Sequence, residues 1–320
     1  SREPDMAEPS YRKLHESGAL EKRIVSALEA LRSCRVCPRD CRVDRTGRET
    51  GRCRTGRYAS VASFSPHFGE ESPLVGSGGS GTIFFSSCNL LCSFCQNYEI
   101  SHFNEGAPAG PQELADMMLR LQKAGCCNIN FVSPSHVAPQ ILEALPAAIE
   151  GGLSVPLIYN TGGYDSIETL RLLDGVIDIY MPDFKFWDPA PAAAYCGAPD
   201  YPEKARAALK EMHTQVGDLV TDERGIAVRG LLVRHLVMPG GLAGTARIMS
   251  FIAEEISKKT YVNVMDQYRS CYLACEDGSI SRRITRREYE EALKSADDAG
   301  LTRIDHRCRR VLERFFFDGI

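Results

Sequence analysis

Three cysteines stand close together in the segment SSCNLLCSFCQNY, where Cys88, Cys92 and Cys95 form a C-x3-C-x2-C array. A loop this tight can wrap three thiolates around one corner of an iron–sulfur cube. Three protein ligands leave the fourth iron open to a small bidentate ligand, such as the amino and carboxylate groups of an amino acid. A zinc site, for which His102 lies close enough in sequence, or three unrelated buried cysteines are the alternatives.

Four more cysteines, Cys34, Cys37, Cys41 and Cys53, lie near the N-terminus with C-x2-C-x3-C-x11-C spacing. Four thiolates satisfy a tetrahedral metal completely, so we expect either a structural zinc or a second, fully ligated iron–sulfur cluster here. Reduced thiols without a metal are the alternative. Cys271 and Cys275 form a later pair whose role the sequence leaves open.

The composition is that of a soluble globular protein, with 43% hydrophobic and 25% charged residues in a chain of 320. The net charge of −4 gives no general attraction to nucleic acid or to an anionic membrane. The sequence has neither an apolar run of membrane-spanning length nor the apolar core of a signal peptide. We therefore predict a cytoplasmic protein with no nucleic-acid or membrane partner, in which the cysteines serve metals rather than disulfides.

From Gly79 onward, short β-branched runs alternate with helical stretches, a pattern typical of parallel strands joined by crossover helices. The predicted strands lie near residues 81–87, 127–133, 155–160, 175–183, 229–240 and 261–268, and the predicted helices at 111–124, 138–150, 165–173, 189–220 and 243–258. The expected organisation is an N-terminal helical, Cys-rich extension (1–78), a barrel region (79–285), and a C-terminal helix and tail (286–320).

Polar side chains follow the ends of these strands, namely Ser133, Asn160, Asp183 and Gln267. Six βα units fit a doubly wound sheet or an incomplete (β/α) barrel, and both folds place their chemistry at the carboxyl ends of the strands. The sequence therefore predicts an α/β protein whose site combines these residues with the cysteine triad.

At the triad the sequence resembles the radical S-adenosylmethionine (SAM) superfamily, whose C-x3-C-x2-C loop follows the first strand of a partial (β/α)6 TIM-type barrel. The resemblance implies a 4Fe-4S cluster on Cys88, Cys92 and Cys95, with SAM at the open iron. Phe94, just before the third cysteine, matches an aromatic residue that usually lies beside the adenine ring in that family.

Further motifs resemble the branch that includes pyruvate formate-lyase activating enzyme, over roughly residues 79–270. MPDFKF matches its D-x-K motif and implies SAM contacts for Asp183 and Lys185. VRHLVMPG resembles the fifth-strand R-x-x-x-x-P-G pattern and implies a carboxylate or ribose contact for Arg234. YNTGGYD resembles the T-N-G-Y segment after the third strand and points to Asn160 and Thr161.

One motif of that branch is absent. Where the activating enzymes carry a Gly-Gly-Glu turn after the second strand to hold the methionyl amino group, this chain reads SPSH, and the hydroxyls of Ser133 and Ser135 would take that role. The chain resembles activating-enzyme-like proteins without an assigned substrate.

The resemblance implies an oxidoreductase that cleaves SAM reductively to a 5′-deoxyadenosyl radical, with reduced flavodoxin or ferredoxin as electron donor. The substrate is either a protein that receives a glycyl radical, or a peptide or small molecule that undergoes radical modification. A non-catalytic zinc-binding scaffold is the alternative from another functional class.

Overall fold

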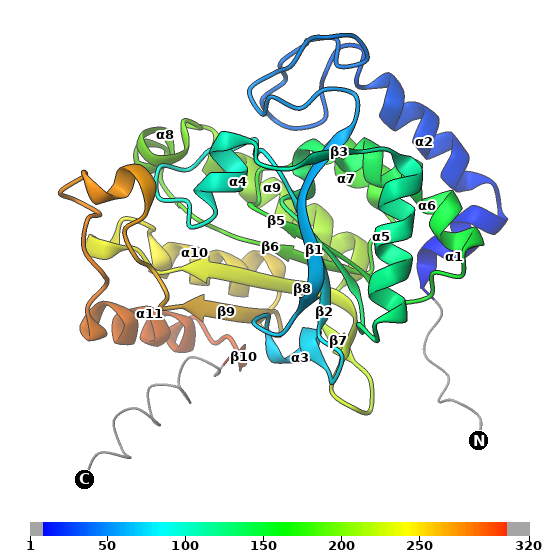
Figure 1. The fold of residues 1–320 in the computed structure, drawn as a ribbon. Coiled ribbons are helices and arrows are strands. Elements are labelled where there is room, and N and C mark those ends of the chain that lie inside the picture. Colours follow the sequence, from blue (N-terminus) through cyan, green and yellow to red (C-terminus); the bar gives the residue numbers. More distant parts are fainter. Residues whose placement is uncertain (1–8, 306–320) are drawn as a thin grey trace.

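The computed structural model describes residues 9–305 (Figure 1). Its strands are β1 (Ala59–His67), β2 (Ser80–Phe85), β3 (Ala107–Ala109), β4 (Ile129–Val132), β5 (Leu157–Thr161), β6 (Ile179–Pro182), β7 (Val220–Thr221), β8 (Ala227–Leu236), β9 (Tyr261–Met265) and β10 (Arg303–Ile304). Its α-helices are α1 (Ser10–Glu16), α2 (Ala19–Glu29), α3 (Ser72–Val75), α4 (Tyr98–Phe103), α5 (Pro111–Lys123), α6 (Ala138–Glu150), α7 (Ile167–Leu173), α8 (Pro189–Cys196), α9 (Tyr201–Val216), α10 (Thr245–Phe251) and α11 (Arg286–Asp298). Short turns of other helix types lie at Pro134–His136, Pro239–Gly241, Ile252–Ile256 and Tyr272–Cys275.

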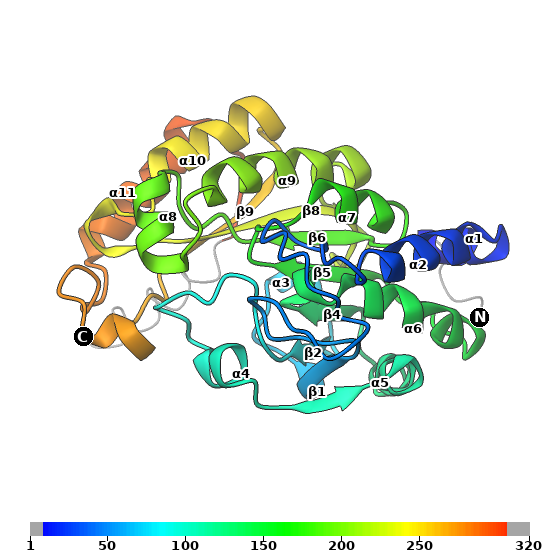
Figure 2. The same cartoon turned by 90° about the horizontal axis from the view of Figure 1, so that it is seen from above.

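The strands of the described residues form one ten-stranded sheet in the order β10-β9-β8-β6-β5-β4-β2-β1-β3, with β7 paired to β8. The neighbours from β2 to β10 run parallel, whereas β1 runs antiparallel to β2 and β3 antiparallel to β1. Figure 2 shows the larger helices along the outer side of the curved sheet. The α/β class is thus confirmed, and the sheet is not closed, because β3 and β10 remain at its two edges.

The six expected parallel strands are all present. Their sequences are apolar runs because the strands are buried. β5 and β6 are buried at every residue, as expected for central strands covered on both faces. The long helical stretch predicted at 189–220 is instead two helices, because the chain adopts the left-handed conformation at Gly197 (φ 55°) and α8 ends there. The helix predicted to begin at Asp165 is capped by Ser166, whose hydroxyl accepts from the Thr169 amide.

Strand β1 comes from the stretch that the sequence analysis assigned to the N-terminal extension. It pairs with β2 along its length, with a register shift between Val61 and Ser63. The sheet therefore reaches back to Ala59, well before the Cys loop. Residues 306–320, which include the expected C-terminal tail and Cys308, lie outside the described part of the chain.

Among residues 9–305, the structure contains no helix of the length and apolar character that crossing a membrane requires.

Two buried histidines near the strand ends are held in the neutral form. Burial, followed by the charge of Arg45, lowers the pKa of His136 to about 4, and burial lowers that of His235 to about 4. Nδ1 of His235 donates to the Phe184 carbonyl at 2.7 Å, so Nε2 accepts from the Thr245 hydroxyl at 2.9 Å. His235 must therefore remain uncharged for the Thr245 contact to persist.

Because the folded-state pKa of each histidine lies below the unfolded value of about 6.5, their contribution to stability is complete above pH 6.5 and is lost as pH falls toward 4. We expect the free energy of unfolding, measured by urea titration, to fall by several kcal/mol over this range, roughly 1.4 kcal/mol per unit and per histidine. His235→Gln should remove about half of this dependence, because His136 remains. An unchanged free energy between pH 6.5 and 4.5 in the wild type would contradict the assignment.

Candidate functional site

A cavity of about 380 Å³ lies at the carboxyl ends of the parallel strands. Every site residue that the sequence predicted around the triad lines it: Cys88, Cys92, Phe94, Cys95, Ser133, Ser135, Asn160, Asp183, Lys185 and Arg234, together with Thr161 and Gln267. They come from the ends of β2, β4, β5, β6, β8 and β9. The parallel topology thus brings side chains separated by up to 179 positions in sequence to one place.

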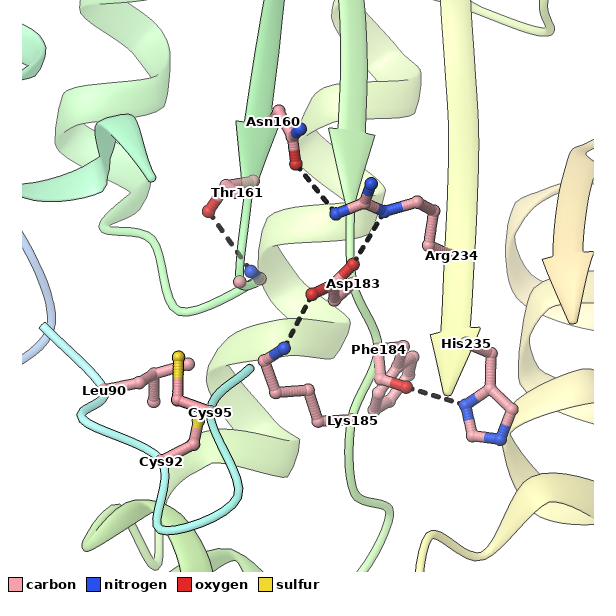
Figure 3. Close-up of polar contacts among 12 residues, drawn as sticks. Leu90, Cys92, Cys95, Asn160, Thr161, Asp183, Phe184, Lys185, Arg234 and His235 are labelled. Atoms are coloured by element: carbon pink, nitrogen blue, oxygen red, sulfur yellow. Dashed lines mark hydrogen bonds and ion pairs between the residues drawn. The ribbon is translucent and has the colours of Figure 1, made fainter. Parts of the chain in front are cut away.

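A charge cluster centred on Asp183 lies in the wall of the cavity (Figure 3). One carboxylate oxygen accepts from Lys185 Nζ at 2.6 Å and the other from Arg234 Nε at 2.9 Å. Arg234 Nη2 also donates to the Asn160 side-chain oxygen at 2.9 Å. The cluster therefore links the ends of β5, β6 and β8.

The Asp183 carboxyl group stays ionised although it is buried. Burial opposes its charge, but the adjacent Lys185 and Arg234 outweigh burial and lower its pKa to about 2. Burial likewise opposes the charge of Lys185, and the Asp183 carboxylate raises the pKa of the lysine above its usual value. At neutral pH the site thus presents two fixed cations and their counter-ion.

A hydroxyl relay lies beside this cluster. Ser135 Oγ is 2.8 Å from Thr161 Oγ1, which donates to the buried Asp165 carboxylate at 2.6 Å. Ser135 also hydrogen-bonds to Asp165 and Tyr159, so these hydroxyls and the carboxylate form one buried network beside the cavity. Ser133 adopts a left-handed conformation (φ 60°), and its amide donates to the Asn160 carbonyl.

The loop that follows β2 carries the three predicted cluster cysteines to the same cavity. Burial raises the pKa of Cys88 to about 12 and also raises that of Cys95, while contact with Cys196, and then burial, raises that of Cys92. The thiols are therefore protonated at neutral pH, and binding of a metal would release their protons. Within residues 9–305, no three metal-ligating side chains converge in metal-binding geometry.

Phe94, between the second and third cysteines, is buried at the cavity wall. Its ring meets Phe186 edge-on at 5.8 Å and Tyr268 at 6.3 Å between centroids. This packing holds the Phe94 ring in place at the cavity wall.

The N-terminal cysteines form a separate group. Cys34, Cys37 and Cys53 are buried and Cys41 is half-buried. Burial raises the pKa of Cys37 to about 12, with smaller contributions from Cys53 and Cys34. The metal predicted for this group stays a prediction, because in the described part of the chain these thiols do not form a metal-binding cluster as they stand.

Arg39, inside the N-terminal Cys segment, reaches into the triad loop. Its guanidinium donates to the Asn89 carbonyl at 2.7 Å and to the Cys196 carbonyl at 2.9 Å, and it stacks over the Tyr164 ring. The N-terminal segment is thereby fastened to the loop that carries Cys92.

Sequence reasoning missed two residues that shape the site. Glu70, between β1 and α3, lines the cavity and lies 3.7 Å from Arg234. Tyr201 is buried in α9, where its hydroxyl accepts from the Lys185 amide at 2.9 Å and contacts the Gly162 and Asp183 carbonyls, each at 3.0 Å. Neither residue belongs to a strand-end motif. Their contacts are with residues distant in sequence, which residue spacing does not predict.

Replacing Asp183 by Asn leaves Lys185 without its buried counter-ion and leaves Arg234 with only the more distant Glu70. We expect the free energy of unfolding to fall by about 3–5 kcal/mol, as is usual when one partner of a buried ion pair is removed. Asp188→Asn is the matched control, since its pair with Arg247 is exposed and is expected to contribute under about 1 kcal/mol. Equal losses in the two variants, measured by urea denaturation, would refute this view of the cluster.

Comparison with known proteins gives one informative match. No family model matches the chain. The chain is 33% identical over 290 residues to an uncharacterized protein of Methanocaldococcus jannaschii, MJ0674, and the alignment covers 88% of this chain and 79% of that protein. An identity of this extent shows common descent across nearly the whole chain, and the protein therefore belongs to the same family as MJ0674.

Proposed function

We propose that this protein is a radical SAM enzyme built on a partial (β/α)6 barrel, in which Cys88, Cys92 and Cys95 hold a 4Fe-4S cluster. The observation that carries the proposal is that the three thiols share one cavity with Phe94 and with the Asp183, Lys185 and Arg234 cluster. The partial barrel is supported by six parallel strands in sequence order, from β2 to β9, in an open curved sheet.

The donor set fits an iron–sulfur cluster better than the zinc alternative. Nε2 of His102, the side chain that could complete a zinc site, donates to the Cys92 carbonyl at 3.0 Å, and His102 is not among the residues that line the cavity. The three thiols are the only cysteines among its lining residues, which suits a cluster with one iron left open. Rotation of the cysteine side chains would be needed for them to converge.

When bound, the cluster and SAM would supply one-electron cleavage of the sulfonium, giving methionine and a 5′-deoxyadenosyl radical that abstracts hydrogen from a substrate. The protein's part is to bind, orient and exclude water. Lys185 and Arg234 offer charges for the methionyl carboxylate or the ribose, and Asn160 and Asp183 hold those cations in place. Ser133 and Ser135 replace the missing glutamate as partners of the amino group, and Phe94 offers a face for the adenine.

A cavity of this volume accommodates one small-molecule ligand, such as the proposed cofactor. The proposed substrate therefore presents a C–H bond at the cavity mouth, from a peptide or a small molecule. Activation of a glycyl-radical protein is one form of this reaction. Reduced flavodoxin or ferredoxin is the proposed electron donor, and the N-terminal cysteines are proposed to hold a structural zinc or a second cluster.

The direct test is anaerobic reconstitution with iron and sulfide. We expect a brown protein that forms 5′-deoxyadenosine from SAM with dithionite, measured by chromatography. Cys92→Ser should abolish both the triad's iron and 5′-deoxyadenosine, because two thiolates cannot hold the cluster.

Cys127→Ser is the control. Cys127 lies outside the cavity, and its thiol donates to the Leu74 carbonyl, which a serine hydroxyl can also reach. This variant should keep both signals. A colourless wild-type protein that binds only zinc would instead favour the scaffold alternative, and product formation by Cys92→Ser would show the triad to be wrongly assigned.

A further inference from the structure

Cys196, the last residue of α8, lies directly against Cys92. Their sulfur atoms are 3.3 Å apart, and both residues are buried, with exposed fractions of 1% and 8%. The other two triad thiols have different neighbours. Cys88 Sγ accepts from the Leu90 amide, and Cys95 Sγ accepts from the Ser101 hydroxyl. The structure thus singles out one cysteine of the triad for contact with a fourth thiol.

As they stand, the sulfur atoms of Cys92 and Cys196 are closer together than those of two thiolates on one metal would be. Two thiolates on one tetrahedral metal, each roughly 2.3 Å from it, stand roughly 3.8 Å apart, and thiolates on separate irons stand farther apart still. A sulfur–sulfur separation of 3.3 Å is a contact between thiols, from which a small movement forms a disulfide.

The two chain segments are clamped together independently of their thiols. Arg39 donates to the Asn89 carbonyl on the triad loop and to the Cys196 and Gly197 carbonyls at the end of α8. The Ser93 amide donates to the Tyr195 carbonyl at 2.8 Å, directly beside the cysteine pair. This clamp holds the two thiols at close range in the folded protein.

We propose that Cys92 and Cys196 form a reversible disulfide when the triad carries no cluster. The two thiols lose two electrons and two protons to hydrogen peroxide, which becomes two molecules of water, and exchange with a small dithiol restores both thiols. Cys92 lines the cavity, so a small oxidant reaches it from solvent. The bond itself does not depend on the proposed function, whereas its consequence does: with Cys92 oxidised, the triad cannot take up iron.

The test uses the full chain, stripped of metal with a chelator and treated anaerobically with one equivalent of hydrogen peroxide. Alkylation and peptide mass mapping should find a crosslink between the peptides that contain Cys92 and Cys196, which dithiothreitol removes. Cys196→Ser and Cys196→Ala should both lack it, while Cys127→Ser keeps it. A crosslink from Cys92 to Cys88 or Cys95, or a Cys92 that remains fully alkylatable, would overturn the proposal.

Iron uptake separates this proposal from the proposed function. Oxidised wild-type protein should bind at least about fivefold less iron at the triad than the dithiol-reduced protein, and Cys196→Ala should bind iron equally under both treatments. If the crosslink forms but the reduced protein takes up no iron, the disulfide stands and the radical SAM assignment fails. Equal iron uptake by the crosslinked and the reduced wild-type protein would overturn the proposal that the disulfide prevents the triad from binding iron.

Discussion

The buried charge cluster around Asp183 is the interaction on which the geometry of the site depends. A single carboxylate is bound by Lys185 from its own strand-end segment and by Arg234 from β8, and Arg234 in turn holds Asn160 at the end of β5. Burying such charges is costly unless each is paired and hydrogen-bonded. Because Asn160, Asp183 and Arg234 come from the ends of three different strands, their pairing also fixes the spacing of those ends.

Uncharged contacts also hold together the loops that follow β5 and β6. Gly163 has φ +79°, and a Cβ there would lie 2.3 Å from the Asp183 carbonyl, so only glycine permits the two loops to approach so closely. Tyr201 then contacts both loops through one hydroxyl. Together with the Arg39 contacts, they attach α9 and the N-terminal segment to the loops that line the cavity.

Much of this arrangement could be predicted from local sequence. The parallel strands are apolar runs with polar residues at their ends, and strand C-terminal ends converge in any βα fold, so the association of Asn160 with Asp183 followed from their positions in the sequence. Arg234 was expected at the site only from the resemblance to activating enzymes. Glu70 and Tyr201 could not be found in this way, because their roles arise from contacts with strands distant in sequence. Cys196 belongs to no sequence motif, and only the fold places it beside Cys92. Strand β1 was missed because most of its residues are half-buried or exposed and the apolar signal is weak.

The central claim is that the triad leaves one iron open to SAM, and electron–nuclear double resonance tests it most directly. The reduced, reconstituted protein would be studied with SAM labelled with 15N at its amino group. The proposal predicts a nitrogen coupling strong enough to require a direct bond between that amino group and the cluster. A reduced cluster whose resonance is unchanged by SAM and shows no such coupling would contradict it.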